Sequence, residues 1–302
     1  MLPVSLKRYA WLSIAAALTT ILLKGVAWRL TGSVGLLSDA LESFVNLAGA
    51  LMALAMLSLA ALPPDDNHAH GHGKAEYFSS AFEGFLIVVA AAGIAYAALE
   101  RLFNAQPLET VGLGLGVSVA ASIVNFATAR ILLAVGRTYG SITLEADARH
   151  LLTDVWTSAG VIVGVGLAWL TDRLWLDPAI ALLVAANIVR TGWELMRRSA
   201  AGLMDASMSE PELKRIGQIL ESYRQHGLDF HALRTRQAGR RAFVTLHVLV
   251  SGTWTVQQGH DWCERIEANL RRTIPHFNVT THLEPTEDPL AHADLELDRP
   301  ID

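Results

Sequence analysis

Residues 34–62 read VGLLSDALESFVNLAGALMALAMLSLAAL, an apolar run whose only charged residues are Asp39 and Glu42. A helix needs about 20 mostly apolar residues to cross the ~30 Å hydrocarbon core of a bilayer, so this run is long enough to span a membrane. Ionisable side chains inside such a helix are costly and by default indicate function. The stretch therefore predicts a membrane fold and a polar site within it.

Five further apolar segments flank this run, at approximately 9–30, 78–103, 107–135, 143–171 and 177–196. Turn residues such as Pro63-Pro64 and Asp177-Pro178 separate them. The first segment is too long for a removable signal peptide and has no small-residue cleavage site. We predict an all-α six-helix transmembrane bundle over residues 1–200.

The composition agrees with a membrane body that carries a soluble part. The 302 residues are 52% hydrophobic and 18% charged, whereas about a quarter of the residues in a soluble domain are charged. Charges are sparse between residues 9 and 195 and dense after Arg197. The net charge of −5 excludes the basic excess of a nucleic-acid binder. The single cysteine, Cys263, excludes an internal disulfide and a thiolate metal site.

Lysine and arginine in the short connections predict the orientation, because they favour the cytoplasmic side. With a cytoplasmic amino terminus, the inner residues are Lys7, Arg8, Lys74, Arg130, Arg137, Arg197 and Arg198, and the outer ones are Arg29, Arg101 and Arg173. We therefore expect a multi-pass protein with both termini in the cytoplasm. The chain carries no organellar targeting segment, which favours a bacterial inner membrane.

The part of the chain after residue 200 has the periodicities of a small soluble domain. Helical spacing of apolar residues is found at 210–224 and 255–273, and alternation typical of strands at 230–237, 242–250 and 277–284. The order αββαβ predicts a two-layer α+β cytoplasmic domain over residues 201–288. Residues 289–302 are acidic, and we predict a flexible tail there.

The second and fifth predicted helices share one pattern of polar residues. The matching residues are Asp39, Glu42 and Asn46 in the second helix, and Asp147, His150 and Asp154 in the fifth. Because side chains four residues apart stack on one helical face, the two helices can bring four ligands to one point. These are Glu42, Asn46, His150 and Asp154, a mixed oxygen and nitrogen set that suits a tetrahedral divalent transition metal. Interhelical hydrogen bonds or helix-end residues are the alternative, and two pairs at metal-ligand spacing favour the metal.

Two histidine-rich regions form further candidate metal sites. The loop 65–74 (DDNHAHGHGK) follows the second helix, and its three alternating histidines beside two carboxylates could bind a metal. In the soluble domain the candidates are His231, His247, His260, His282 and Glu284. His282 and Glu284 lie two residues apart and so share a strand face. An ordinary polar loop and surface histidines are the alternatives.

Lys24 and Glu83 also lie in apolar runs, where each could line a polar path or pair with a neighbouring charge.

These motifs resemble the cation diffusion facilitator family, six-helix exporters of divalent transition metals with a metallochaperone-like cytoplasmic domain. GSVGLLSDALESFVNLAGA and ADARHLLTDVWTSAG resemble the family's second and fifth helices. DDNHAHGHGKAE, ALRTRQAG and HLEP resemble the loop and the tail domain of the bacterial iron and zinc efflux branch. The resemblance extends from the first helix to about Pro285.

The resemblance implies roles for particular residues. It implies that Glu42, Asn46, His150 and Asp154 form the transport site, that the loop site uses Asp65 and His72 with His68, and that the tail-domain site lies near a homodimer interface. It also places Lys74 and Asp205 where relatives form an interdomain salt bridge. Family members usually have His or Asp in place of Glu42 and Asp in place of Asn46, so this chain has less negative charge at the site.

Together these features predict a secondary active transporter that exports a divalent metal in exchange for protons. Zinc is the first candidate, with iron, manganese, cobalt, nickel and cadmium open. The predicted partners are divalent metal ions as substrate and regulator, protons, the lipid bilayer and a second copy of the chain. The sequence has no HExxH helix, nucleophile elbow or phosphate loop, which argues against an enzyme. A membrane-bound metal sensor without flux is the main alternative, and a non-metal cation antiporter would leave the histidines unexplained.

Overall fold

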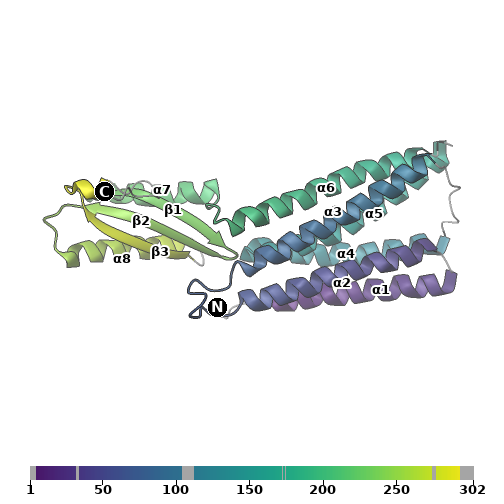
Figure 1. Cartoon of the computed structure of the whole chain (residues 1–302), viewed down its shortest axis with the longest axis horizontal. Coiled ribbons are helices and arrows are strands. Elements are labelled where there is room, and N and C mark those ends of the chain that lie inside the picture. The colour runs from purple at the N-terminus through teal and green to yellow at the C-terminus, as the bar shows by residue number, and fades with distance from the viewer. Residues whose placement is uncertain are drawn as a thin grey trace. The chain divides into compact units, whose positions relative to one another are not determined.

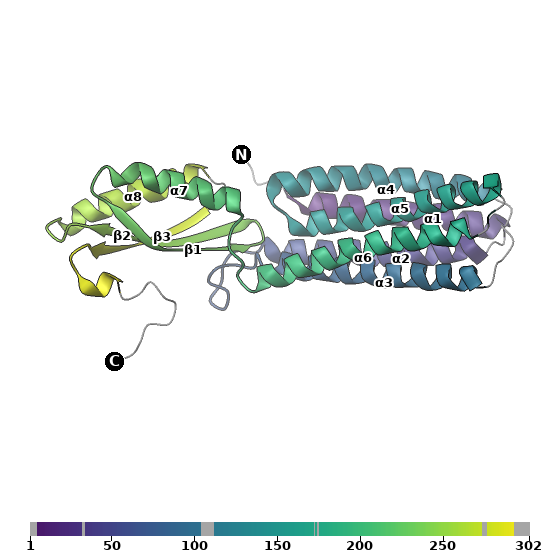
Figure 2. The same ribbon diagram turned by 90° about the horizontal axis from the view of Figure 1, so that it is seen from above.

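The computed structural model describes residues 5–31, 34–103, 112–171, 173, 175–273 and 277–292. The chain separates into two compact units, Met1–Ala201 and Gly202–Asp302, and each is described by itself. Figures 1 and 2 show a bundle of long helices followed in the chain by a smaller unit with a sheet. The predicted combination of an α-helical membrane bundle and an α+β domain is confirmed.

Six long helices follow one another in the first part of the chain. They are α1 (Lys7–Thr31), α2 (Val34–Ala60), α3 (Ala75–Phe103), α4 (Gly112–Tyr139), α5 (Ile142–Thr171) and α6 (Leu176–Leu203). Each has 25 to 30 residues, which at 1.5 Å per residue gives roughly 37–45 Å, enough to cross a bilayer. The helix α6 continues past the predicted end at residue 196, because the segment RRSAAGL consists mostly of good helix formers.

Within the described residues, five of these helices are long and apolar enough to span a membrane: α1, α2, α3, α4 and α6. The first half of the helix α5 carries Glu145, Asp147, Arg149 and Asp154. Several of these polar residues are buried against other helices rather than exposed. The polar half of α5 is thus packed inside the bundle.

The helices pack through small side chains, as membrane bundles do. One buried cluster joins α1, α4 and α5 through Ala10, Ala129, Ala148 and Leu151, and a second joins α3, α5 and α6. The helices α2, α3 and α4 each contact α5. Large apolar side chains such as Leu30, Phe103 and Leu183 are instead exposed, which suits a lipid-facing surface. This packing surrounds the polar half of α5 with other helices.

The second unit folds in the predicted order αββαβ. Its elements are α7 (Glu210–Arg224), β1 (Asp229–Ala238), β2 (Arg241–Val250), α8 (Val256–Thr273) and β3 (Phe277–Pro285). The sheet order is β1-β2-β3, with β1 antiparallel and β3 parallel to β2. Figure 2 shows α7 and α8 on one side of the sheet. The predicted flexible tail begins instead with a short 3-10 helix, Pro289–His292, and its remainder, 293–302, lies outside the described residues.

The core of this unit lies between the sheet and the two helices. Alternate residues of β2, among them Val244, Leu246 and Val248, pack with Ile216 of α7 and Ile266 of α8. Because strand side chains alternate between faces, His247 of β2 lies on the opposite face, away from the helices. The hydrophobic alternation of β2 thus determines which face of the sheet carries the histidines.

Candidate metal centres

The transmembrane cluster lies where α2, α4 and α5 meet. The Nδ2 group of Asn46 donates a hydrogen bond to Asp154 Oδ2, and Asn125 of α4 donates a second one to the same oxygen over 3.1 Å. All three side chains are buried. The structure thus brings together two of the four predicted ligands, Asn46 and Asp154, and adds Asn125. The side chains of the other predicted residues of α2, Asp39 and Glu42, lie outside the described part of the chain.

His150 lies one turn before Asp154 on α5 and contacts a residue that the sequence left unassigned. Its Nδ1 atom is in hydrogen-bonding contact with Oε2 of Glu83 from α3. His150 is 3% exposed and Glu83 is fully buried. One turn before His150, Asp147 accepts a hydrogen bond of 3.0 Å from the hydroxyl of Ser13 on α1. The polar row of α5 is therefore in contact with α1, α2, α3 and α4.

Several oxygen atoms of this cluster lack a hydrogen-bond partner within the described part of the chain. They are Asn46 Oδ1, Glu83 Oε1, Asn125 Oδ1 and Asp147 Oδ2. Buried polar atoms in folded proteins are nearly always satisfied, so each exception calls for an explanation. All four atoms are acceptors, and a cation satisfies acceptors that no protein donor reaches. The donor chemistry of the cluster therefore fits a bound divalent cation.

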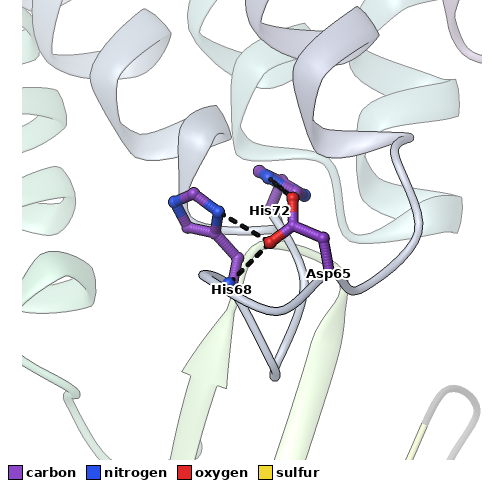
Figure 3. Close-up of side chains that lie close together, drawn as sticks. All are labelled: Asp65, His68 and His72. Carbon is purple, nitrogen blue, oxygen red and sulfur yellow. Dashed lines mark hydrogen bonds and ion pairs between the residues drawn. The ribbon is translucent and has the colours of Figure 1, made fainter.

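The loop cluster brings all three predicted ligands together (Figure 3). Asp65 Oδ1 lies 3.1 Å from His68 Nδ1, and Asp65 Oδ2 lies 3.4 Å from His72 Nε2. Two ligand atoms of a tetrahedral zinc site, each about 2.1 Å from the metal, are roughly 3.4 Å apart. The side chain of His72 is 8% exposed, whereas His68 and Asp65 are more than half exposed. The His72 side of the cluster is therefore buried, whereas the side with Asp65 and His68 is open to solvent.

Hydrogen bonds hold the Asp65 carboxylate in its ionised form. Desolvation acts to raise its pKa, but the backbone N–H and side chain of His68 and the backbone N–H of Asn67 outweigh that effect and lower the pKa. The backbone bonds are 2.7 Å and 3.0 Å long. Because a metal ligand must be deprotonated, this geometry keeps Asp65 ready to bind a cation.

The sheet of the second unit carries the third cluster. Across the sheet, His231 of β1, His247 of β2 and His282 of β3 occupy paired positions. Oε2 of Glu284 lies 2.9 Å from His231 Nε2 and 3.2 Å from His247 Nδ1, and those two nitrogens are 3.2 Å apart. His282 lies 3.4 Å from the other carboxylate oxygen and is exposed. Four of the five predicted residues are thus neighbours.

The fifth predicted residue of this cluster, His260, is an exposed residue of α8, and none of the contacts described for the cluster includes it. Beside His231, the strand β1 has an irregular register between His231 and Arg234, and Ala232 adopts a positive φ of 48°. Bulges of this kind re-aim side chains near functional sites. The strained backbone thus adjoins a candidate ligand.

The predicted interdomain pair, Lys74 and Asp205, belongs to two different units. Within its own unit, Asp205 forms an ion pair of 3.3 Å with Arg236. The salt bridge between Lys74 and Asp205 stays a prediction.

Comparison with known proteins shows which family the chain belongs to. The family model of the cation efflux transmembrane domain matches residues 10–204, and that of the cation efflux protein cytoplasmic domain matches residues 208–286. The chain belongs to the cation diffusion facilitator family. The predicted family resemblance is confirmed, and this protein is a multi-pass membrane protein of a family of cation efflux transporters.

Individual relatives match the cation diffusion facilitator chain over most of its length. An uncharacterized transporter of Synechocystis is 53% identical over 281 residues, which cover 93% of this chain and 91% of the relative. The cation-efflux pump FieF of Shewanella oneidensis is 28% identical over 279 residues, covering 91% of this chain and 92% of the relative. A solved structure from work on the mode of action of CzrB is 34% identical over 26% of this chain and 96% of that structure, with a TM-score of 0.25.

In this cation diffusion facilitator, reasoning from the sequence missed Asn125 and Ser13 and left Glu83 without a role. Asn125 and Ser13 are common residue types whose helical face is fixed only by packing. Glu83 gave the stronger signal, since it is a charged residue in the long apolar run of α3. No acidic residue or histidine lies three or four residues from Glu83 in that run, so the sequence did not indicate its contact with His150.

Proposed function

We propose that this protein exports a divalent transition metal from the cytoplasm in exchange for protons. The observation that supports this proposal most strongly is the buried cluster of carboxylate, amide and imidazole groups between α2, α3, α4 and α5, with its unsatisfied oxygen acceptors. A polar cluster that lies deep within an apolar bundle suits a cation that passes through the membrane.

The cargo would bind to Glu42, Asn46, His150 and Asp154. Three oxygens and one imidazole nitrogen suit zinc first, because zinc accepts four mixed nitrogen and oxygen ligands in tetrahedral geometry. Iron, manganese, cobalt, nickel and cadmium use similar donors and form the panel against which zinc must be compared. The amide of Asn46 makes the site less negative than one with a second carboxylate in that position.

Proton exchange follows from the chemistry of the same ligands. A protonated imidazole or carboxylic acid offers no lone pair to a metal, so protons and the cation compete for the site. A proton gradient directed into the cytoplasm then drives release of the cation on the other side. This requires the bundle to open alternately to the two sides, as transporters with midplane sites do.

The two cytoplasmic clusters would serve capture and regulation. The loop cluster, on the predicted cytoplasmic side, offers Asp65 and two histidines to incoming ions. In the second unit, His231, His247 and Glu284 would bind metal and tighten a homodimer when cytoplasmic metal is high. The match of this unit to the family's cytoplasmic domain supports the dimer. We further propose a bacterial inner membrane as its location, with both termini in the cytoplasm.

A metal sensor without flux is the second candidate. A sensor explains the clusters of the loop and the sheet equally well. A sensor needs no binding site inside the bilayer. It therefore does not explain why Asn46, Asn125, His150 and Asp154 form a buried cluster within the membrane helices. The buried cluster therefore favours transport.

The test is cation uptake by proteoliposomes under an imposed pH gradient, across the panel of metals. His150→Ala and Asp154→Ala should each reduce the initial uptake rate at least tenfold, since each removes a ligand. His226→Ala, an exposed histidine that stacks on Trp262, serves as the matched control and should transport as wild type does. Unchanged flux in both site variants would rule out the proposed site, and binding without flux in wild type would favour the sensor.

A further inference from the structure

Glu83 is the one fully buried carboxylate of the described bundle that contacts a predicted cargo ligand and is not itself a predicted ligand. It lies in the first half of α3, with no exposed surface. Its Oε2 atom is in hydrogen-bonding contact with His150 Nδ1, and its Oε1 atom has no hydrogen-bond partner among the described residues. A buried acid in a membrane bundle is costly unless it interacts with a compensating group.

We propose that Glu83 is a positioning residue for His150 and supplies negative charge to the cargo site. The inference rests on the proposed transport function of His150. If Nδ1–H donates to the Glu83 carboxylate, the lone pair of the neutral imidazole lies on Nε2, which is then the nitrogen that binds the cation. Metal-binding histidines commonly donate their second ring N–H to a carboxylate in this way, which fixes the tautomer and the ring orientation.

The packing around Glu83 shows that α2 makes room for it. A Cβ atom added at Gly49 would lie at 2.9 Å or less from both oxygens and the carboxyl carbon of Glu83. Gly49 lies three residues after Asn46, so the two share one face of α2. Glu83 therefore occupies a space that exists because residue 49 has no side chain, next to the turn that carries a predicted ligand.

The position of Glu83 also affects the net charge around the cargo site. Asn46 contributes a neutral amide, which leaves Glu42 and Asp154 as the acids of the predicted ligand set. Through His150, Glu83 adds a third negative charge near a divalent cation. A purely structural hydrogen bond between α3 and α5 would stabilise the fold equally well, but it would leave the apparent affinity for the cation unchanged. The two roles are thus separated by the KM for the cation.

The experiment measures initial zinc uptake by proteoliposomes as a function of zinc concentration. Glu83→Leu removes the acceptor and the charge, and it should raise the KM by 10- to 100-fold, the usual effect of losing such a partner. Glu83→Gln keeps an acceptor oxygen and should give a smaller increase. The control is Glu76→Gln, because Glu76 is an equally buried acid of α3 that instead accepts a hydrogen bond from Ser141, and its KM should equal that of wild type.

Gly49→Ala provides an independent test that retains Glu83. The new methyl group would displace the carboxylate, so this variant should also raise the KM, but it should have no further effect in the Glu83→Leu protein. Should Glu83→Leu not fold, Gly49→Ala decides. If flux still depends on His150, a KM within twofold of wild type in Gly49→Ala or in a folded Glu83→Leu protein overturns the inference. Flux that does not depend on His150 overturns the proposed function, and the inference with it.

Discussion

Asn46 of α2 donates its amide N–H to Asp154 Oδ2 of α5, and Asn125 donates to the same oxygen. Without a cation, these two amides therefore compensate the Asp154 carboxylate. A carboxylate in place of Asn46 could not donate this bond, and it would face Asp154 as a like charge in a buried setting. The amide thus stabilises the cation-free state at the expense of attraction for the cation.

Asn46→Asp should therefore lower the stability of the cation-free protein. We expect a loss of about 1–3 kcal/mol, because a buried hydrogen bond is replaced by an unsatisfied and repelled group. Zinc should bind more tightly and restore the lost stability. Thermal unfolding of the purified protein with and without zinc measures both effects. Equal melting temperatures for wild type and variant in the absence of zinc would contradict the role assigned to Asn46.

The close approach of α3 and α6 gives a second prediction. A Cβ atom at Gly192 would lie 2.7 Å from the backbone oxygen of Gly84, and one at Gly84 would lie 2.9 Å from the backbone oxygen of Gly192. Backbone atoms cannot rotate away, so Gly192→Ala should separate the helices and destabilise the bundle by about 1–3 kcal/mol. Gly93→Ala, on the same α3 but with open space around it, is the control. A Gly192→Ala protein as stable as Gly93→Ala would show that the helices do not pack in this way.

The histidine and glutamate cluster of the sheet can be tested in the isolated unit 202–302, since that unit has its own hydrophobic core. Glu284 contacts both His231 and His247, so Glu284→Gln should weaken zinc binding at least tenfold in calorimetric titration. His226→Ala, which removes an exposed histidine of the same unit, should bind as wild type does. Zinc binding that is unchanged in Glu284→Gln would show that this cluster does not bind zinc.

The loop cluster has a predictable pH dependence. The pKa of Asp65 is lowered in the folded protein, so its contribution to stability is present above the ordinary carboxyl pKa and is lost only as the pH falls through the lowered value. Between pH 7.5 and 5.5 Asp65 therefore stays ionised and keeps its lone pairs available to a cation. The carboxyl carbon shift of Asp65, assigned with Asp65→Asn, should stay constant over this range. A shift that titrates there would refute the assignment.

Much of this architecture could be predicted from local patterns in the sequence. The apolar runs locate the six helices because a bilayer demands length and low charge, and the alternation of Ala242, Val244, Leu246 and Val248 locates β2 and its core face. The loop cluster was predictable as well, since Asp65, His68 and His72 are close in the sequence.

Contacts between distant helices could not be predicted in the same way. Helical spacing shows that His150 and Asp154 share a face of α5, but it does not show which helix lies opposite. The contacts of Glu83 with His150 and of Asn125 with Asp154 depend on helix rotation and on close approach at Gly49. In the sheet, the position of His231 depends on the irregularity near Ala232, which no period-two pattern indicates.

Exchange of a metal for protons at the buried cluster can be tested by measuring luminal pH and zinc together in proteoliposomes. Zinc added outside should enter the lumen while protons leave, so that the lumen becomes more alkaline as zinc accumulates. In Asp154→Ala both signals should fall together. Zinc uptake by wild type without any change of luminal pH, or an undiminished pH change in Asp154→Ala, would contradict metal–proton exchange at this cluster.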